Sequence, residues 1–376
     1  MRLGMFMMPL HRAGRPMHDT LAEDTEKALL LDELGFDELF IGEHFSIATE
    51  PYPSPLMFAA SLLPRTERLV FGTGVINAPL RHPALIAAEA AQFDHLSKGR
   101  FILGIGTGST PTDNEMLGVS ADPRERGKML IDSIEMIEKI WASDPPYDLE
   151  GKYWKTQIKD TPLAALGFGQ LPKPYQKPGP QIAIPSSTGD SPSVQIAGRK
   201  GWSVISSTLL ARDDLARHWQ TYRKGCAEAG RPADGGKWRV CRSIFVAPTD
   251  QEAHTRAFSA ESGHRHFFGH MHGVYSHIGR LGVIKPRPDM RDDEVTVDTF
   301  LEQRLIYGSP KTVLNELLSL RRHVGPFGTL ILSCVDWAGV SAAWERESWS
   351  LLAKEVMPAF RAQAAFIDAE AQQAAE

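Results

Sequence analysis

Short apolar runs alternate with amphipathic stretches along most of the chain. The runs are rich in Val, Ile, Leu and Phe with little polar alternation, which is typical of strands buried on both faces of a sheet. The predicted strands are Arg2–Met8, Glu38–Gly42, Leu69–Ile76, Phe101–Ile105, Gln181–Pro185, Trp202–Ser206, Trp238–Val246 and Thr329–Val335. The predicted helices are Asp19–Leu34, His82–Ser97, Arg124–Trp141, Asp213–Ala229, Pro310–His323 and Ala342–Met357, with weaker patterns at Pro53–Leu62 and Ser193–Lys200.

This alternation of eight strands with eight helical segments predicts a parallel sheet, because each helix returns the chain to the same end of the sheet. Eight such units can close a barrel, and an open doubly wound sheet is the alternative. We therefore expect an α/β fold, a (β/α)8 TIM barrel, as a single domain over residues 1–360, with a C-terminal tail at 361–376.

Two segments exceed the length that the alternation needs. Residues 143–179, after the fourth strand and its helix, are rich in Pro, Gly and Tyr and have the pattern of a long loop. Residues 248–305, after the seventh strand, form the longer insertion. Because loops at the carboxyl ends of barrel strands build the active-site face, both are predicted to be active-site insertions.

Composition narrows the class of protein. The 376 residues are 42% hydrophobic and 23% charged, with a formal net charge of −5, which is normal for a globular protein and argues against a nucleic-acid partner. The three cysteines are scattered, as in a reducing compartment. There is no signal-peptide pattern, and no apolar run approaches the roughly 18 residues that span a bilayer. We expect a cytoplasmic enzyme with no membrane partner.

Three glycines at the end of the fourth strand, Gly104, Gly106 and Gly108, allow more than one interpretation. A dinucleotide fingerprint needs its third glycine three residues after the second and a helix that opens there. Here that position is Ser109, followed by the pattern of a loop, so this interpretation fails. Small residues at a strand end can instead admit a planar ligand close to the backbone. Glycines that only ease a tight turn are the alternative, and the residues leave both open.

Charged and polar residues also end the second and third strands. Glu43 and His44 lie at the rim where a barrel places its active site, so we take both as catalytic candidates. His44 is expected to act in the chemistry and Glu43 to support the rim, although a salt bridge and a loop cap would also explain the pair. Asn77 follows the third strand, and His82–Pro83 indicates a plain helix start.

Serines follow the fifth strand and precede a helix. Hydroxyls and unpaired amides at a helix start favour an anion, which predicts a phosphate site at Ser186, Ser187, Ser191 and Ser193. Ordinary N-capping by Ser191 or Ser193 is compatible with this prediction.

The second insertion contains a run from Gly263 to His277 with five histidines, a residue type that often binds zinc. Because no Asp, Glu or Cys accompanies them at ligand spacing within the run, we expect no metal. Mixed with Phe and Met, the run is instead predicted to be an aromatic pocket wall or lid, which suggests a hydrophobic substrate.

Taken together, these motifs resemble the bacterial luciferase-like family of flavin-dependent monooxygenases. The matching segments are Leu34–His44, Gly72–Val75, His82–Pro83, Leu96–Arg100, Gly104–Gly108 and Gly308–Val313. Each is weak alone, but they occur in the family's order and cover most of residues 1–360. Residues 146–154 and 173–178 are most similar to members that act as limonene monooxygenases.

The resemblance implies a barrel that binds FMN at the carboxyl ends of its strands, with His44 in the active site. It implies a cis peptide bond between Gly74 and Val75 against the flavin, with Gly106 and Thr107 also touching the ring. Family members that emit light carry a reactive cysteine at the position of Gly106, so we expect no light emission. The full set of expected cofactor contacts is Gly74, Val75, Asn77, Gly106, Thr107, Tyr153, Ser186, Ser187, Ser191 and Ser193.

The implied function is a monooxygenase that uses reduced FMN and O2 to oxygenate a small hydrophobic organic substrate. No nicotinamide site is visible, so a separate flavin reductase is expected to supply the reduced FMN. We also expect a homodimer or a higher homo-oligomer. A deazaflavin-dependent oxidoreductase of the same fold, a flavin-binding protein without turnover and a metal-dependent barrel hydrolase are the alternatives.

Overall fold

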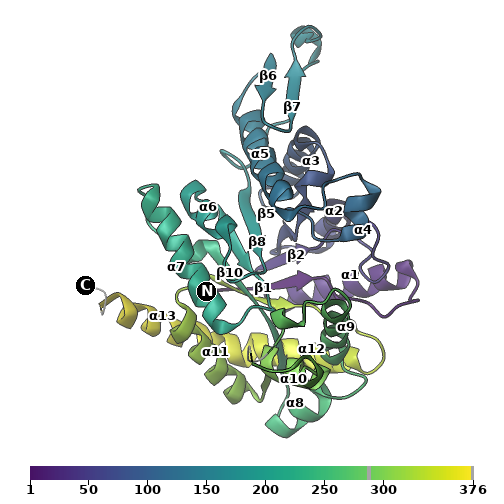
Figure 1. Cartoon of the computed structure of the whole chain (residues 1–376), viewed down its shortest axis with the longest axis vertical. Coiled ribbons are helices and arrows are strands. Elements are labelled where there is room, and N and C mark those ends of the chain that lie inside the picture. Colours follow the sequence, from purple (N-terminus) through teal and green to yellow (C-terminus); the bar gives the residue numbers. More distant parts are fainter. Residues whose placement is uncertain (286–288, 374–376) are drawn as a thin grey trace. The chain divides into compact units, whose positions relative to one another are not determined.

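The computed structural model describes residues 1–285 and 289–373, in which strands alternate with helices (Figure 1). The strands are β1 (Arg2–Met7), β2 (Glu38–Ile41), β3 (Val70–Thr73), β4 (Ile76–Asn77), β5 (Phe101–Gly106), β6 (Tyr147–Glu150), β7 (Lys155–Ile158), β8 (Gln181–Ser186), β9 (Ser203–Ser206), β10 (Trp238–Val246), β11 (Leu305–Gly308) and β12 (Thr329–Ser333). The helices are α1 (Met17–Leu34), α2 (Pro55–Leu62), α3 (Pro83–Leu96), α4 (Pro111–Met116), α5 (Pro123–Ala142), α6 (Pro192–Lys200), α7 (Arg212–Glu228), α8 (Asp250–Ala257), α9 (Gly263–His277), α10 (Val297–Arg304), α11 (Pro310–Val324), α12 (Ser341–Leu351) and α13 (Met357–Gln373).

The main sheet closes on itself. Its order is β11-β10-β12-β1-β2-β3-β5-β8-β9, and β10 also pairs with β9. Of its 10 strands, β4 lies beside β5 and β11 beside β10, which leaves eight strands in the closed circuit. The neighbours β1–β12, β10–β12, β3–β5 and β5–β8 are parallel. This topology confirms the predicted (β/α)8 TIM barrel.

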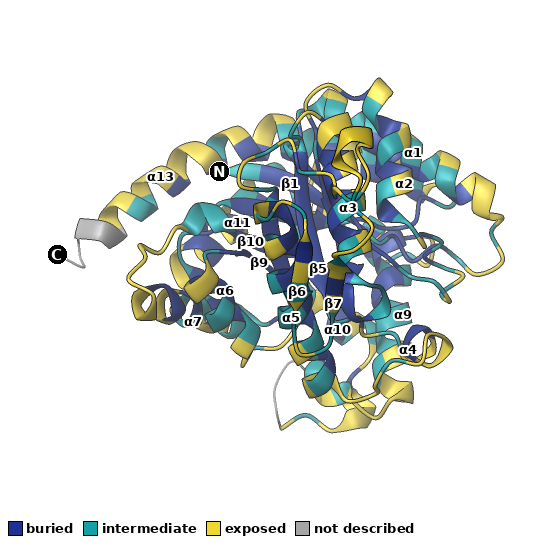
Figure 2. Ribbon diagram, turned by 90° about the horizontal axis from the view of Figure 1, so that it is seen from above, coloured by how far each residue is buried: buried dark blue, intermediate teal, exposed yellow. Residues whose placement is uncertain are grey.

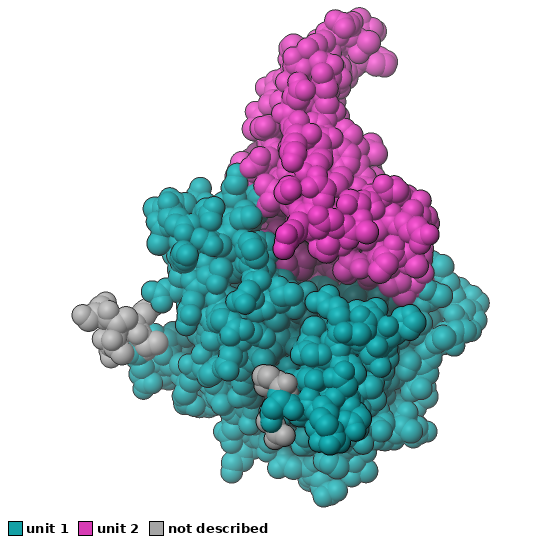
Figure 3. Space-filling model, in the orientation of Figure 1, with its two compact units in different colours: residues 1–39, 48–50, 186–376 teal, residues 40–47, 51–185 magenta. Residues whose placement is uncertain are grey.

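The chain divides into two compact units, coloured separately in Figure 3. Unit 1 comprises residues 1–39, 48–50 and 186–376, and unit 2 comprises residues 40–47 and 51–185. A single domain over residues 1–360 stays a prediction, as does a separate tail at 361–376. Helix α13 continues to Gln373, and residues 374–376 of that tail lie outside the described residues.

The helix boundaries follow local chemistry that the sequence already displayed. Helix α3 begins with Pro83 after the N-cap His82, whose Nδ1 accepts a hydrogen bond from the Ala84 amide, as expected for a plain helix start. Helix α1 ends at Gly35, whose φ of 81° is the left-handed conformation that a glycine adopts without a steric penalty.

Three local predictions were wrong. Residues 143–179 are not only loop, because they contain the antiparallel hairpin β6–β7 (Figure 1). Its strands are short and largely polar, so no apolar run marks them. The loop predicted after Gly108 gives way to helix α4 at Pro111. The third strand is broken at Gly74–Val75 into β3 and β4.

Burial divides each unit into a strand core and an outer helical surface, as the dark strands and lighter helices in Figure 2 show. Every residue of β10 is buried. The insertion at 248–305 contributes α8, α9 and α10 and leads directly into β11. Its Phe268 and Phe300 are fully buried in a cluster with Phe245 of β10. Phe267 is 7% exposed in the same cluster. The prediction of an aromatic pocket wall is therefore wrong for Phe267 and Phe268, which form the core of the insertion. The insertion's residues 286–288 lie outside the described residues.

Among the described residues, we find no helix that combines the length and the apolar character needed to cross a membrane.

Strand β5 approaches its neighbours so closely that side chains do not fit at two of its positions. A Cβ placed on Gly104 would lie 1.7 Å from the carbonyl oxygen of Thr73. A Cβ on Gly106 would lie 2.6 Å from Cγ2 of Val75 and 3.2 Å from Cγ of Pro185. The space that side chains at Gly104 and Gly106 would need is therefore filled by Thr73, Val75 and Pro185. It is not open beside the backbone.

A buried ion pair lies in unit 1. Arg239 of β10 donates from Nε and Nη2 to the two carboxylate oxygens of Glu38 at 2.7 and 2.9 Å, and both side chains are at most 1% exposed. Arg2 adds a second, more exposed cation 3.1 Å from Glu38. Two nearly parallel hydrogen bonds of this kind fix geometry as well as charge.

We predict that Glu38→Gln lowers the free energy of unfolding by about 3–5 kcal/mol, because it leaves the Arg239 guanidinium buried without its counter-charge. Urea denaturation of the purified variant measures this. Glu228→Gln is the control, since the Arg199–Glu228 pair is exposed and its loss should cost less than about 1 kcal/mol. Equal effects of the two substitutions would contradict a structural role for the buried pair.

We also predict that Gly104→Ala destabilises the protein by about 3 kcal/mol, the upper end for overpacking, because its Cβ meets rigid backbone. Gly127→Ala in α5 is the matched control: nothing lies within 4 Å of its Cβ, so it should stabilise by about 0.5–1 kcal/mol. Thermal unfolding of both variants tests whether Gly104→Ala lowers the stability and Gly127→Ala raises it. An unchanged stability of Gly104→Ala would mean that β5 and β3 can separate to admit the methyl group.

Candidate active site

Glu43 follows β2 and binds the end of β4. Its side chain is 2% exposed; Oε2 accepts a hydrogen bond from the Asn77 amide and Oε1 one from Arg81, both at 2.8 Å. The Asn77 side-chain amide donates back to the Glu43 carbonyl at 3.1 Å. Burial raises the pKa of Glu43 to about 7, and Arg81 and the Asn77 amide oppose this effect. Glu43 therefore positions these segments, as predicted for support of the rim.

His44 lies next to Glu43 and faces the start of α4. Its Nδ1 is 3.0 Å from the Thr110 hydroxyl and 3.9 Å from Oδ2 of Asp113. Burial lowers the pKa of His44 below its ordinary 6.5, and Asp113 opposes this. Asp113 is itself buried and accepts hydrogen bonds from the amides of Ser46 at 2.8 Å and Phe45 at 3.3 Å. A neutral imidazole at this position can accept a proton at neutral pH.

The break between β3 and β4 lies beside this pair. The Gly74–Val75 peptide bond is cis, which confirms the geometry that the resemblance implied. The Gly74 amide donates to the carbonyl of Ile41 at 2.6 Å, and Asn77 pairs with Gly106 in the register of β4 and β5. Unit 2 thus brings together Glu43, His44, Gly74, Val75, Asn77, Gly106 and Thr107 at the ends of β2, β4 and β5.

Arg126 is a residue of this region that the sequence analysis missed. It is 6% exposed, on the first turn of α5, and donates from Nε to the carbonyl of Gly108 at 3.1 Å and from Nη1 to that of Ser120 at 2.7 Å. Burial lowers its pKa, with Asp122 opposing. The sequence marks Arg126 only as a helix residue, because the turn that aligns it with Gly108 depends on the intervening α4.

Tyr153 belongs to the turn of the β6–β7 hairpin and is attached to the same end of α5. Its hydroxyl donates to Glu125, and its amide donates to Oδ2 of Asp132 at 2.8 Å. These bonds hold Tyr153 against the face of α5 that carries Glu125 and Asp132. Contact of Tyr153 with a cofactor stays a prediction.

The serines lie in unit 1, at the end of β8 and the start of α6. Ser186 is buried, and its hydroxyl is 3.3 Å from Nε2 of His218, a residue that the sequence analysis also missed. His218 binds Ser206 through Nδ1 at 2.9 Å, and burial lowers its pKa. This network gives Ser186 a structural role, since its hydroxyl is occupied by the protein.

The remaining serines surround a helix start. Ser191 is the N-cap of α6, yet among the described residues its side chain makes no capping hydrogen bond; it instead contacts the Ser193 hydroxyl at 2.7 Å. Ser187 is exposed on the loop before it. Amides at such a start, together with two hydroxyls, can accept an anion. The predicted N-capping by Ser191 is thus wrong.

The histidine run forms α9 and is used internally. His266 and His272 hydrogen-bond the carbonyls of Leu10 at 2.9 Å and Val295 at 2.6 Å through Nε2. Among the described residues, the group with ligand atoms close enough to share a metal is elsewhere: His11, Glu23 and Asp336. Arg15 and Lys27 already pair with its carboxylates.

Comparisons with known proteins agree with this geometry. The sequence model of the luciferase-like monooxygenases matches residues 1–325. The 4-hydroxyprotoasukamycin monooxygenase of Streptomyces nodosus subsp. asukaensis is 31% identical, with 95% of this chain and 91% of the relative covered. Limonene 1,2-monooxygenase of Rhodococcus erythropolis is 29% identical, with 95% and 86% covered.

Among solved structures, the oxygenating constituent of 3,6-diketocamphane monooxygenase from Pseudomonas putida, a type II Baeyer–Villiger monooxygenase in complex with FMN, superposes with a TM-score of 0.85. It is 27% identical, and the match covers 95% of this chain and 98% of that one. The matches extend over nearly the whole barrel and agree with the flavin-dependent oxygenation that the motifs predicted. The chain therefore belongs to the luciferase-like monooxygenase family.

Proposed function

We propose that the chain is the oxygenating component of a two-component monooxygenase. It would use FMN, reduced by a separate flavin reductase, and O2 to oxygenate a small hydrophobic organic substrate. The observation that carries the proposal is the buried group at the ends of β2, β4 and β5, where His44 lies beside Glu43, Asn77 and the Gly74–Val75 bond. The similarity to an oxygenating constituent that binds FMN supports it.

Each unit, taken by itself, has residues that fit the phosphate of FMN. In unit 1, the Ser191 and Ser193 hydroxyls lie at the start of α6. Among the described residues, the side chain of the N-cap Ser191 caps none of the amides there, so it does not compete with an anion for them. In unit 2, Arg126 is a buried cation that donates hydrogen bonds to the carbonyls of Gly108 and Ser120. A buried guanidinium that binds only neutral acceptors is suited to an added anion.

The ring of FMN would contact Gly74, Val75, Gly106 and Thr107. When bound and reduced, FMN supplies the electrons that activate O2. Val75 fills part of the space beside Gly106, so we expect the ring to contact the Val75 side chain as well as the Gly106 backbone. Glu43, through Arg81 and Asn77, would keep these segments in place.

His44 would hold or move the proton of the oxygenation step. Its lowered pKa keeps the imidazole neutral at pH 7, so it can accept a proton from the substrate or from the oxygen group. The Thr110 hydroxyl, 3.0 Å from Nδ1 of His44, would fix the orientation of the imidazole. Glu43 is a positioning residue in this scheme, because its carboxylate is occupied by Arg81 and Asn77.

The names of the relatives indicate the substrate class. Two of the three are named for limonene and for 3,6-diketocamphane, and the third for 4-hydroxyprotoasukamycin. Limonene and diketocamphane are a small alicyclic alkene and a small alicyclic ketone. We therefore propose a small alicyclic ketone or alkene. A homodimer or higher homo-oligomer in the cytoplasm stays a prediction.

We predict that the purified protein, mixed with chemically reduced FMN and isotopically labelled O2, transfers one labelled oxygen atom to a bicyclic ketone or to limonene. Mass spectrometry of the product and stopped-flow absorbance measure this. Oxidised FMN and heat-denatured protein are the controls. Weak FMN binding together with tight binding of a deazaflavin, and no oxygen transfer, would favour the deazaflavin-dependent alternative.

We predict that His44→Ala retains reduced FMN but loses about 100-fold or more in kcat, the usual contribution of a general acid or base. The acid limb of the wild-type kcat/KM profile should have its midpoint below 6.5, because only the neutral imidazole accepts a proton and burial lowers its pKa. The residual activity of His44→Ala should lack that limb.

Glu43→Gln distinguishes the two neighbouring groups. A wild-type midpoint near 7 that disappears in Glu43→Gln would assign the titration to Glu43 and contradict the role of His44. A midpoint below 6.5 that persists in Glu43→Gln would support it.

A further inference from the structure

Strand β10 changes its neighbour halfway along one edge. Its first part, Trp238–Val240, pairs with β9, and its last part, Ser243–Val246, pairs with β11. Cys241 and Arg242 lie between the two paired stretches, and on the other edge both pair with β12. A gap between β9 and β11 is thus built into the sheet of unit 1.

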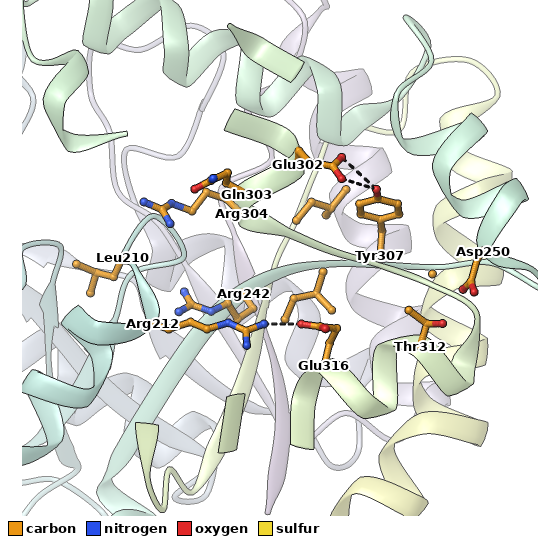
Figure 4. A pocket seen from close by; sticks show the side chains of 13 residues that line it. Leu210, Arg212, Arg242, Asp250, Glu302, Gln303, Arg304, Tyr307, Thr312 and Glu316 are labelled. Atoms are coloured by element: carbon orange, nitrogen blue, oxygen red, sulfur yellow. Dashed lines mark hydrogen bonds and ion pairs between the residues drawn. The ribbon is translucent and has the colours of Figure 1, made fainter. Parts of the chain in front are cut away.

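A cavity of about 400 Å3 lies at this gap, lined by the start of α7, by β10 and β11, by the end of α10 and by α11 (Figure 4). All its lining residues belong to unit 1, and none is among the flavin candidates. Three arginines from separate elements contribute to it: Arg212 of α7, Arg242 of β10 and Arg304 of α10.

Within the described residues, two of these guanidinium groups have no acidic partner. Arg242 is 4% exposed and donates from Nη1 only to the carbonyls of Thr208 at 3.3 Å and Cys241 at 3.1 Å. Nε of Arg304 is buried without a hydrogen-bond partner. Within the described part of the chain, neither arginine forms an ion pair; Asp214, which acts on Arg304 electrostatically, is paired with Arg217.

Each carboxylate that lines the cavity has a partner. Glu316 is paired with Arg212, Glu302 accepts the Tyr307 hydroxyl at 3.0 Å, and Asp250 accepts the Ser309 amide at 2.7 Å. Figure 4 shows Arg242, Arg304 and Arg212 at one end of the cavity, with Asp250 and Tyr307 toward the other. Burial, with Arg304 and Arg212 nearby, lowers the pKa of Arg242 to about 9, which is the mark of uncompensated positive charge.

We propose that this cavity is a second anion site, which binds the phosphate group of a small phosphorylated molecule between Arg242 and Arg304. Arg212 is paired with Glu316, and Asp250 and Glu302 also line the cavity, so the phosphate would bind at the end where Arg242 and Arg304 lie. A phosphate monoester carries about −1.5 to −2 at pH 7. Guanidinium groups match phosphate oxygens in geometry. The cavity has further room beside Leu305 and Tyr307 for the organic body of the ligand.

The bound anion would connect the insertion to the barrel. Arg304 ends α10 of the insertion, directly before β11, while Arg242 belongs to the core strand β10. A phosphate held by both would fasten β11 to the part of β10 that has no neighbour on that edge. The site therefore couples occupancy by a phosphorylated molecule to the stability of the insertion.

Titration of the full-length protein with inorganic phosphate and with inorganic pyrophosphate, followed by calorimetry, tests the proposal. We expect a site whose Kd is at least about tenfold weaker in Arg304→Gln, which corresponds to the loss of one charge-assisted contact. Arg304→Lys keeps the positive charge without the paired N–H donors of the guanidinium, so its affinity for phosphate should fall less than that of Arg304→Gln. Circular dichroism of the unliganded variants checks that they fold.

Two controls separate this cavity from other sites. Arg199→Gln removes an exposed arginine and should leave the Kd unchanged. Ser193→Ala changes the start of α6, the expected FMN phosphate site, and should also leave the Kd for phosphate at the Arg242–Arg304 cavity unchanged. Binding that is lost in Ser193→Ala but kept in Arg304→Gln, or the absence of any binding to wild-type protein, would overturn the proposal.

Discussion

The close approach of β5 to β3 and β4 is the constraint on which the candidate site depends. The carbonyl of Thr73 and the side chain of Val75 occupy the places that Cβ atoms would take at Gly104 and Gly106. Only glycine permits this spacing, because any larger residue would separate the strands. With the strands this close, Asn77 pairs with Gly106, and the Gly74–Val75 bond lies beside the end of β5.

Burial sets the electrostatics around this constraint. Glu43 is removed from water, yet Arg81 and the Asn77 amide satisfy its carboxylate, so it fixes the ends of β2 and β4. His44, one residue later, is partly buried, and its Nδ1 lies 3.9 Å from Oδ2 of Asp113. The same loss of solvent therefore gives a positioning carboxylate and a neutral imidazole, which suits the proton transfer that a family monooxygenase requires.

The pairing of β10 determines the structure around the insertion. β10 is buried at every residue. It pairs with β12 at Arg239–Arg242 on one edge, and on the other edge with β9 at Trp238–Val240 and with β11 at Ser243–Val246. The insertion supplies β11, and its phenylalanines form a core of their own with Phe245. An insertion before β11 can thus add a charged cavity while the parallel barrel stays closed. The barrel closes because β9 keeps the first part of this edge of β10, and β11 pairs only with the last part.

The sequence by itself determined the barrel and its order of strands, since apolar runs and amphipathic helices report burial that every parallel strand shares. It also determined the family through short motifs around His44, Gly74–Val75 and Gly106, and the cis bond followed from that resemblance. Tertiary structure decided the rest. The hairpin β6–β7 has no apolar run, Arg126 and His218 lie in helices without a motif, and Arg242 is a strand residue like any other. Their partners are distant in the chain, so only the folded arrangement shows which polar groups are buried together and which charges remain uncompensated.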